Sequence, residues 1–338
     1  MAVVIEDLTF LDRGRVAARN CQVNLTTCCS RRCLFCPQSS GRAGLPAGAV
    51  ESGLRAYARR RGRVLRRTEL ILTGGEPAFS PDLLPAARLG RDLGFRSITL
   101  LSSPAPFADA DFARSVHRAG VGRLFLSLHS CRPEVHDLLT GEKGGFAAAV
   151  EGLSRCLRMG FEHVTCNMVL TKLNWRDIPA TARFLAGLKR RAGPGPSPAL
   201  FVSTMEENPW WDRLSVPHSR AVPGVLQAVR EGRVPLMRFM GDWAMPACVG
   251  GLASRAPGLI PLGRMDSRTW RAPEGWAPAV LPSPEACRRV KALQCRRCAL
   301  DRVCGGLSRV YAERYGVDEL SALAGPLPRA GRGQVFIV

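Results

Sequence analysis

Between about residues 20 and 205, six short apolar runs alternate with longer stretches of helical periodicity. One such stretch, from Phe146 to Leu157, repeats its apolar residues every three or four positions and so presents one apolar helix face. A second starts at Ile178, just after Asn174 and Asp177, which suit a helix N-terminus. The six apolar runs are Gln22–Thr26, Glu69–Thr73, Ser97–Ser102, Arg123–Leu128, His163–Leu170 and Ala199–Thr204. Nearly continuous apolar strands that alternate with helices predict an α/β fold with a parallel sheet and right-handed crossovers.

Six strand–helix units are too few for a closed eight-stranded barrel and predict an open, partial (β/α)6 barrel of the TIM type. Beyond residue 235 the alternation stops, and a stretch rich in Pro, Gly and Trp leads into a compact Cys-rich segment. We therefore expect an N-terminal segment at 1–19, the barrel at 20–235, a small metal-supported domain at 236–325 and a C-terminal tail at 326–338.

The cysteine content needs a chemical explanation that fits the cellular compartment. No apolar run reaches the about 18 residues of a transmembrane helix, so we expect no membrane partner. The first residues include Glu6, Asp7 and Asp12 and lack the basic start of a signal peptide, which indicates a cytoplasmic protein. Because cytoplasmic thiols stay reduced, the 13 cysteines indicate metal ligation rather than disulfides.

The first cysteine group follows the first predicted strand directly. Cys29, Cys33 and Cys36 have the spacing C-x3-C-x2-C. Three thiolates on one loop can hold three corners of a [4Fe–4S] cluster and leave one iron open, whereas a structural zinc site usually takes four protein ligands. A loop at the C-terminal end of a barrel strand is also where such folds place their chemistry.

The second strand ends in Gly74-Gly75-Glu76-Pro77, which is either a plain glycine turn or a place where the backbone approaches a ligand closely. Together with the three cysteines one strand earlier, this motif resembles the radical S-adenosylmethionine (SAM) superfamily, over roughly residues 20 to 320. The resemblance implies that the cysteines bind a [4Fe–4S] cluster whose open iron is chelated by SAM. It also implies that Gly74, Gly75, Glu76 and Pro77 hold the methionine amino group, and that Phe35 lies beside the adenine.

Single polar residues near the other strand ends extend the resemblance. Ser127 is expected to contact the ribose or the methionine carboxylate, and Asn167 and Ser102 are further SAM-binding candidates. For each of them an ordinary strand-end hydrogen bond is the alternative. His129 is a candidate acid or base near the site, and Cys131 beside it is a candidate catalytic thiol.

A second cysteine group lies near the C-terminus, where Cys295, Cys298 and Cys304 have the spacing C-x2-C-x5-C. This pattern resembles the SPASM or twitch extension of radical SAM enzymes, which holds an auxiliary iron–sulfur cluster. It lacks the later cysteines of a full SPASM pattern, which indicates one auxiliary [4Fe–4S] cluster. Cys248 is the expected fourth ligand and Cys287 the competing one, and the spacing alone leaves zinc open.

The chain is strongly basic, with 48 Lys and Arg against 28 Asp and Glu and a formal net charge of +20. Only four of these cations are lysines; the arginine bias resembles the codon usage of a GC-rich genome and needs no functional cause. The densest cluster is either a solvated helix face or an anion-binding patch. It consists of Arg55, Arg59, Arg60, Arg61, Arg63, Arg66 and Arg67. Nucleic acid is therefore not an expected partner.

As the resemblance implies, the protein is an enzyme that reductively cleaves SAM to a 5′-deoxyadenosyl radical, which abstracts hydrogen from a substrate. The expected substrate is a ribosomally made peptide under maturation, or a natural-product or small-metabolite intermediate. The expected partners are a one-electron donor of the flavodoxin or ferredoxin type and, for a peptide, a discrete recognition protein. Two alternatives remain: an RNA-modifying radical SAM enzyme, and a zinc-stabilised basic nucleic-acid-binding protein.

Overall fold

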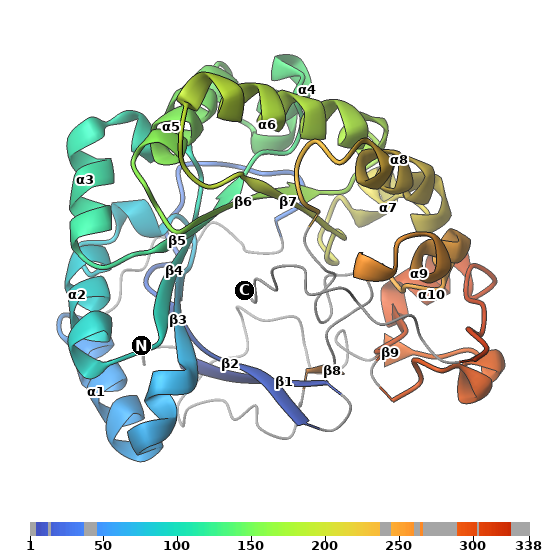
Figure 1. Cartoon of the computed structure of the whole chain (residues 1–338), viewed down its shortest axis with the longest axis horizontal. Helices are drawn as coiled ribbons and strands as arrows, with labels where there is room; N and C mark the ends of the chain where they lie inside the picture. Colours follow the sequence, from blue (N-terminus) through green and yellow to red (C-terminus); the bar gives the residue numbers. More distant parts are fainter. Residues whose placement is uncertain are drawn as a thin grey trace.

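The computed structural model describes residues 5–12, 15–36, 46–236, 245–259, 264–265, 289–302 and 304–325 (Figure 1). Its main feature is a curved sheet with the strand order β7-β6-β5-β4-β3-β2-β1-β8. Neighbouring strands from β2 to β7 are parallel. These strands are β2 (Arg15–Asn24), β3 (Thr68–Thr73), β4 (Ser97–Ser102), β5 (Arg123–Ser127), β6 (His163–Val169) and β7 (Ala199–Ser203). Within the described ranges the sheet does not close, so the predicted partial barrel is confirmed.

The sheet continues past the predicted strands at its N-terminal edge. β2 begins at Arg15, seven residues before the predicted run, and β1 (Ile5–Asp12) pairs with it antiparallel. The two-residue strand β8 (Arg264–Met265) pairs with β1 in turn. The expected N-terminal segment therefore supplies strands to the sheet, which the sequence did not indicate. The domain boundaries at residues 20 and 236 stay predictions, and residues 326–338 lie outside the described part.

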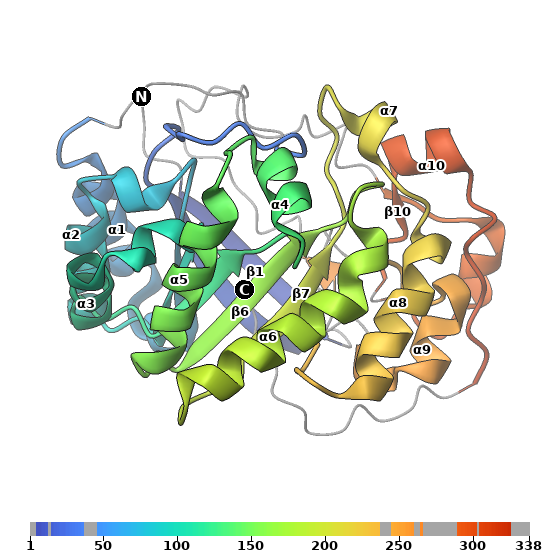
Figure 2. The same ribbon diagram turned by 90° about the horizontal axis from the view of Figure 1, so that it is seen from above.

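Most of the helices lie along the outer, convex face of the sheet (Figures 1 and 2). The α-helices are α1 (Ala49–Arg61), α2 (Leu83–Leu93), α3 (Ala110–Arg118), α4 (Pro133–Thr140), α5 (Gly145–Arg158), α6 (Ile178–Ala192), α7 (Trp211–Leu214), α8 (His218–Glu231), α9 (Leu252–Arg255) and α10 (Arg309–Tyr315). The 3-10 helices are η1 (Gly62–Arg67), η2 (Pro77–Phe79), η3 (Ala105–Ala108), η4 (Trp175–Asp177), η6 (Val249–Gly251), η7 (Pro257–Leu259) and η9 (Leu293–Arg297). In the described part of the chain, no helix has the length and apolar character needed to cross a membrane.

Alternate residues of each strand face the helices or the inside of the curved sheet. On β5, Leu124 and Leu126 are buried in the large core that the sheet forms with its helices. Phe125 faces the other way and packs against Phe201 of β7, at a ring separation of 5.6 Å, in a separate inner cluster with Ala199. The inside of the barrel therefore has an apolar layer below the strand ends.

The C-terminal unit consists of the hairpin β9 (Arg289–Val290) and β10 (Leu307–Ser308), followed by α10. The Tyr311 hydroxyl accepts a hydrogen bond of 2.7 Å from the His218 backbone and donates one to Glu319. The His218 and Tyr311 rings stack at 4.0 Å. These contacts fix the Cys-rich segment against the start of α8.

Candidate functional site

The first cysteine group occupies the loop that leaves the C-terminal end of β2. Cys29, Cys33 and Cys36 are all partly buried, and a bond of 3.1 Å from the Cys36 amide to the Cys33 carbonyl turns the loop back on itself. Burial raises the pKa of Cys29, and it raises the pKa of Cys33 to about 12 together with the thiols of Cys36 and Cys29. Cys33 is thus close enough to Cys29 and Cys36 for their charges to interact, and the raised pKa values of Cys29 and Cys33 disfavour their thiolates unless a metal binds.

The glycine motif holds one side of this loop. The Gly75 amide donates to the Thr26 carbonyl at 2.7 Å, and the Glu76 amide donates to the Cys28 carbonyl at 2.8 Å. A Cβ atom at Gly75 would lie 2.3 Å from that Cys28 oxygen. Gly74 has a φ of +144°, and a Cβ there would lie 2.4 Å from the Thr26 oxygen. The glycines therefore let the exit of β3 pack against the cysteine loop, and their contact with a methionine amino group stays a prediction.

Glu76 joins the exits of β3 and β4, although it was predicted only as part of the glycine motif. Its side chain is buried and accepts hydrogen bonds from the Ser102 hydroxyl at 2.5 Å and the Ser103 amide at 2.9 Å. A third bond of 3.2 Å comes from the Ala78 amide, just after the buried Pro77 opens η2. The structure thus brings two predicted SAM-binding residues, Glu76 and Ser102, into direct contact.

The end of α4 holds the other side of the cysteine loop. The Arg32 amide donates to the Thr140 carbonyl at 3.2 Å, and the Leu34 amide donates to the Leu139 carbonyl at 2.9 Å. Gly141 follows in the left-handed region with a φ of +67°, where a Cβ would lie 2.9 Å from the Arg32 oxygen. The loop is therefore fixed through its backbone on two sides. This second contact was not predicted, because its partners lie more than a hundred residues apart.

His129 lies against Phe35, with ring centroids 4.3 Å apart. It is 2% exposed, and its Nδ1 accepts a hydrogen bond of 3.3 Å from the Val169 amide, so the ring proton is assigned to Nε2. Burial holds the pKa of His129 well below its usual value, with further lowering by His136 and Arg31. His129 is consequently a neutral imidazole at neutral pH, and its role as an acid or base stays a prediction.

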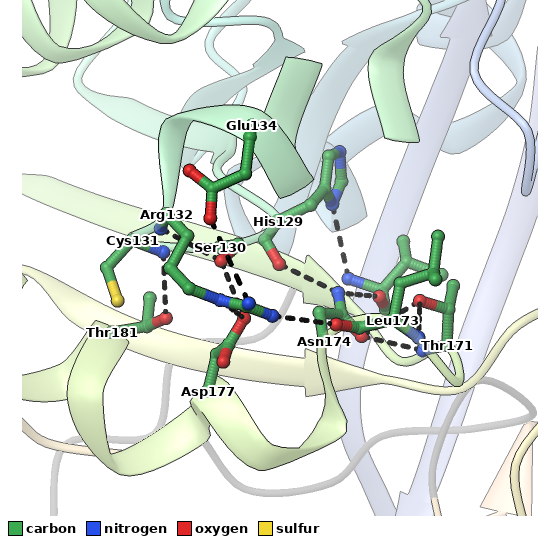
Figure 3. Close-up of polar contacts among 11 residues, drawn as sticks. His129, Ser130, Cys131, Arg132, Glu134, Thr171, Leu173, Asn174, Asp177 and Thr181 are labelled. Carbon is green, nitrogen blue, oxygen red and sulfur yellow. Dashed lines mark hydrogen bonds and ion pairs between the residues drawn. The ribbon is translucent and has the colours of Figure 1, made fainter. Parts of the chain in front are cut away.

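A polar network ties the loop after β5 to η4 and α6 (Figure 3). The buried Ser130 hydroxyl donates to Asp177 at 2.7 Å, and Arg132 donates to the same carboxylate oxygen at 3.1 Å. Asn174 donates to the carbonyls of His129 at 2.7 Å and Val169 at 2.8 Å. The predicted helix start at Asn174 and Asp177 is right, but these side chains hold the neighbouring loop instead of capping the helix.

The structure separates Cys131 from His129. The Cys131 amide donates to the Thr181 hydroxyl at 3.2 Å, and its side chain points toward Thr181 and away from His129 (Figure 3). Burial raises the pKa of its thiol. A catalytic role for Cys131 stays a prediction, but the two side chains do not form a pair.

Ser127 and Asn167 lie opposite each other at the ends of β5 and β6. Facing residues of paired strands point to the same side of the sheet, which here is the inner side that also carries Phe125. Asn167 Oδ1 accepts a bond of 2.8 Å from the Ser203 hydroxyl of β7. The three strand ends therefore present polar groups just above the apolar inner layer, while their contact with SAM stays a prediction.

The second cysteine group gathers four thiols. Burial raises the pKa of Cys248 to about 11, with further contributions from the nearby thiols of Cys304, Cys298 and Cys295. Cys298 Sγ accepts backbone hydrogen bonds from Leu300 at 3.4 Å and Leu323 at 3.5 Å, and Cys304 Sγ accepts one of 3.4 Å from Gly306. Such bonds stabilise thiolate ligands of iron–sulfur clusters. The competing ligand, Cys287, lies outside the described residues.

Across the described residues, no three Cys, His, Asp or Glu side chains lie close enough together to hold one metal ion. Thiolates of a cubane bind different irons and so lie farther apart than the ligands of one zinc ion. The metal that each cysteine group binds stays a prediction.

Comparison with known proteins finds one matching family model and several relatives of similar sequence. The family model of the radical SAM superfamily matches residues 23–185. The AdoMet-dependent heme synthase of Methanosarcina barkeri is 27% identical over 157 residues, which cover 46% of this chain and 44% of that protein. The PqqA peptide cyclase of Ruegeria pomeroyi is 26% identical over 249 residues, which cover 69% of this chain and 64% of that protein. The chain thus spans less than two thirds of the length of either relative.

Among solved structures, the FeFe-hydrogenase maturase HydG from Carboxydothermus hydrogenoformans is similar at a TM-score of 0.52 and 15% identity. The similarity covers 72% of this chain and 57% of that one. At this identity the likeness concerns the fold, and it agrees with the partial barrel described above.

Proposed function

This chain is a member of the radical SAM superfamily, and from that membership we propose that it abstracts hydrogen from a peptide or from a small natural-product intermediate. It is a SAM-dependent enzyme whose family uses a [4Fe–4S] cluster. The single observation that carries the proposal is the three-cysteine loop, which two sets of backbone contacts hold at the C-terminal edge of the barrel.

Cys29, Cys33 and Cys36 would hold the cluster, and Phe35, Ser127 and Asn167 would surround the bound SAM. When bound, the cluster and SAM together supply a 5′-deoxyadenosyl radical, formed by one-electron cleavage of the sulfonium bond. The chain's own contribution is to position the bound SAM and to exclude water from it. The polar strand ends orient SAM, and the apolar layer of Phe125 and Phe201 lines the barrel below them.

Cys248, Cys295, Cys298 and Cys304 would hold an auxiliary [4Fe–4S] cluster of the twitch type. The N–H···S bonds to Cys298 and Cys304 support this assignment. The electron would come from a flavodoxin- or ferredoxin-type donor. A peptide substrate is supported by the similarity to the PqqA peptide cyclase over 69% of this chain, and it would require direct docking or a separate recognition protein.

The basic charge of the chain supports no second candidate function. The exposed arginines of α1 and η1 precede β3, which places them at the amino edge of the parallel strands. The cysteine loop leaves β2 at the carboxyl edge. An RNA held by these arginines would thus lie at the opposite end of the strands from the cysteine loop.

Anaerobic reconstitution tests the proposal. We expect about eight irons per chain, as two cubanes require, and release of 5′-deoxyadenosine from SAM under reducing conditions. Bound zinc without iron, or no 5′-deoxyadenosine, would contradict the proposal.

The substrate class can be tested by hydrogen transfer. Extract from cells grown in deuterated medium is separated into peptide and small-metabolite fractions, and each is incubated with the reconstituted enzyme. Mass spectrometry should find deuterium in the 5′-deoxyadenosine formed with one fraction only. Deuterium from neither fraction would count against both substrate classes.

A further inference from the structure

Two consecutive arginines lie between the first two cysteines of the cluster loop, and the structure treats them differently. The Arg31 side chain is 6% exposed, and its Nε lies 2.7 Å from Glu142 Oε2. Arg32 is exposed to solvent. Two neighbouring positions between the same pair of cysteines thus supply one buried and one solvated cation.

Arg31 is held beside the thiols by the contacts that fix the loop on α4. The Arg32 and Leu34 amides bond to the end of that helix, and Glu142 follows two residues after its last residue, Thr140. Arg31 stands two residues from Cys29 and two residues from Cys33, and its side chain is buried where this loop meets the end of α4. A buried cation therefore stands within the loop that carries the three expected cluster ligands.

We propose that Arg31 raises the reduction potential of the cluster held by Cys29, Cys33 and Cys36, and that Glu142 attenuates this effect. The proposal rests on the proposed function, because it assumes that the cluster forms. Reduction adds one electron from the external donor, so the cluster with its thiolates becomes one unit more negative. A nearby buried cation stabilises that reduced form, because its charge is poorly screened by water.

The ion pair between Arg31 and Glu142 offers two charges whose removal should shift the reduction potential in opposite directions. The Glu142 side chain is 42% exposed and hence partly hydrated, so it cancels only part of the field of Arg31. Removing Arg31 should lower the potential, whereas neutralising Glu142 should raise it. A purely structural role of the pair predicts no such opposition, since either change breaks the same contact.

The experiment is an anaerobic potentiometric titration followed by electron paramagnetic resonance, on the full chain with its clusters reconstituted. The first cluster is identified as the one whose signal changes when SAM is added. The variants are Arg31→Met, Arg31→Lys and Glu142→Gln, with Arg32→Met as the matched control. We expect a shift to lower potential for Arg31→Met, a shift to higher potential for Glu142→Gln, and values near wild type for Arg31→Lys and Arg32→Met.

Shifts of the same sign for Arg31→Met and Glu142→Gln, no shift in either, or an equal shift in Arg32→Met would overturn the inference. If Arg31→Met fails to fold, the two remaining variants decide. A higher potential in Glu142→Gln with a value near wild type in Arg31→Lys would support the inference, and an unchanged or lower potential in Glu142→Gln would overturn it. A wild-type protein without a SAM-responsive cluster would instead overturn the proposed function, so the two failures are distinguishable.

Discussion

The two cysteine groups are prepared for metal in different ways. In the first, the surrounding chain bonds to the backbone of the cysteine loop, through Gly75 and Glu76 on one side and the end of α4 on the other. In the second, backbone amides of Leu300, Gly306 and Leu323 donate to the sulfur atoms themselves. Backbone amides also reach the sulfurs of Cys29 and Cys33 in the first group. The two groups therefore differ in how neighbouring segments hold the backbone of the loop, and not in whether the sulfurs receive hydrogen bonds.

The same difference extends to the arginines that both groups carry between two cysteines. Arg31 of the first group is buried and paired, while Arg296 and Arg297 of the second are exposed. Among the described residues, three thiols interact at the first site and four at the second. Three ligands leave an iron open for SAM, and four complete a cube. The comparison supports the proposal that the reaction takes place at the first site and that the second site has a supporting role.

Replacing the cysteines tests this assignment most severely. Cys29→Ala, Cys33→Ala and Cys36→Ala should each abolish 5′-deoxyadenosine release, because each would remove a ligand of the cluster proposed to bind SAM. Cys298→Ala should lose the auxiliary iron, leaving about four irons per chain, and keep measurable release. Chromatography of 5′-deoxyadenosine with parallel iron analysis measures both effects. Equal loss of release in Cys33→Ala and Cys298→Ala would remove the distinction between the sites.

Gly75→Ala should damage the first site alone. Its Cβ would lie 2.3 Å from the Cys28 carbonyl oxygen, so the cysteine loop must move. Overpacking of this kind costs about 1–3 kcal/mol. We expect loss of the SAM-responsive cluster with the auxiliary cluster retained, measured by iron content and electron paramagnetic resonance.

Gly187→Ala on α6 is the matched control, because only the flexible ends of arginine side chains lie near its added Cβ, the closest at 3.5 Å. It should keep both clusters. Retention of the first cluster in Gly75→Ala would show that the loop does not depend on this close approach.

The six parallel strands were predictable because each is a short apolar run that must be buried on both faces. β1 was not, because Glu6, Asp7 and Asp12 interrupt its apolar pattern and it pairs antiparallel outside the parallel strands. The local cysteine and glycine motifs were also predictable from sequence. The sequence predicted that the two motifs follow neighbouring strands, but it did not predict the contacts between them.

What the sequence could not give are contacts between distant segments. Glu142 pairs with Arg31 across 111 residues, and no local pattern marks either as a partner. Asp177 has the position of a helix cap, yet its carboxylate bonds to Ser130 of the preceding unit. Cys131 was expected beside His129 from adjacency in sequence, but successive side chains point in different directions and Thr181 holds this one aside.

Tyr311→Phe should weaken only the second site. The hydroxyl that it removes accepts from the buried His218 amide at 2.7 Å and donates to Glu319. Leaving that amide without a partner costs about 1–3 kcal/mol. We expect faster hydrogen exchange over residues 289–325 and easier loss of auxiliary iron to a chelator.

Tyr57→Phe is the control, since it removes another largely buried hydroxyl, on α1 of the barrel. It should leave the exchange of residues 289–325 unchanged. The same increase in both variants would mean that the C-terminal unit does not depend on the Tyr311 contact.

The smallest effect is expected from the exposed arginines of the second site. Arg296→Gln and Arg297→Gln each remove a cation that lies between Cys295 and Cys298, as Arg31 lies between Cys29 and Cys33. Because water and salt screen exposed charges, the auxiliary cluster should keep its potential, and stability should change by no more than about 0.5 kcal/mol. Titration of the cluster that does not respond to SAM, with thermal unfolding alongside, measures both. A shift as large as that of Arg31→Met would show that sequence distance from the cysteines, rather than burial, decides how an arginine acts on a cluster.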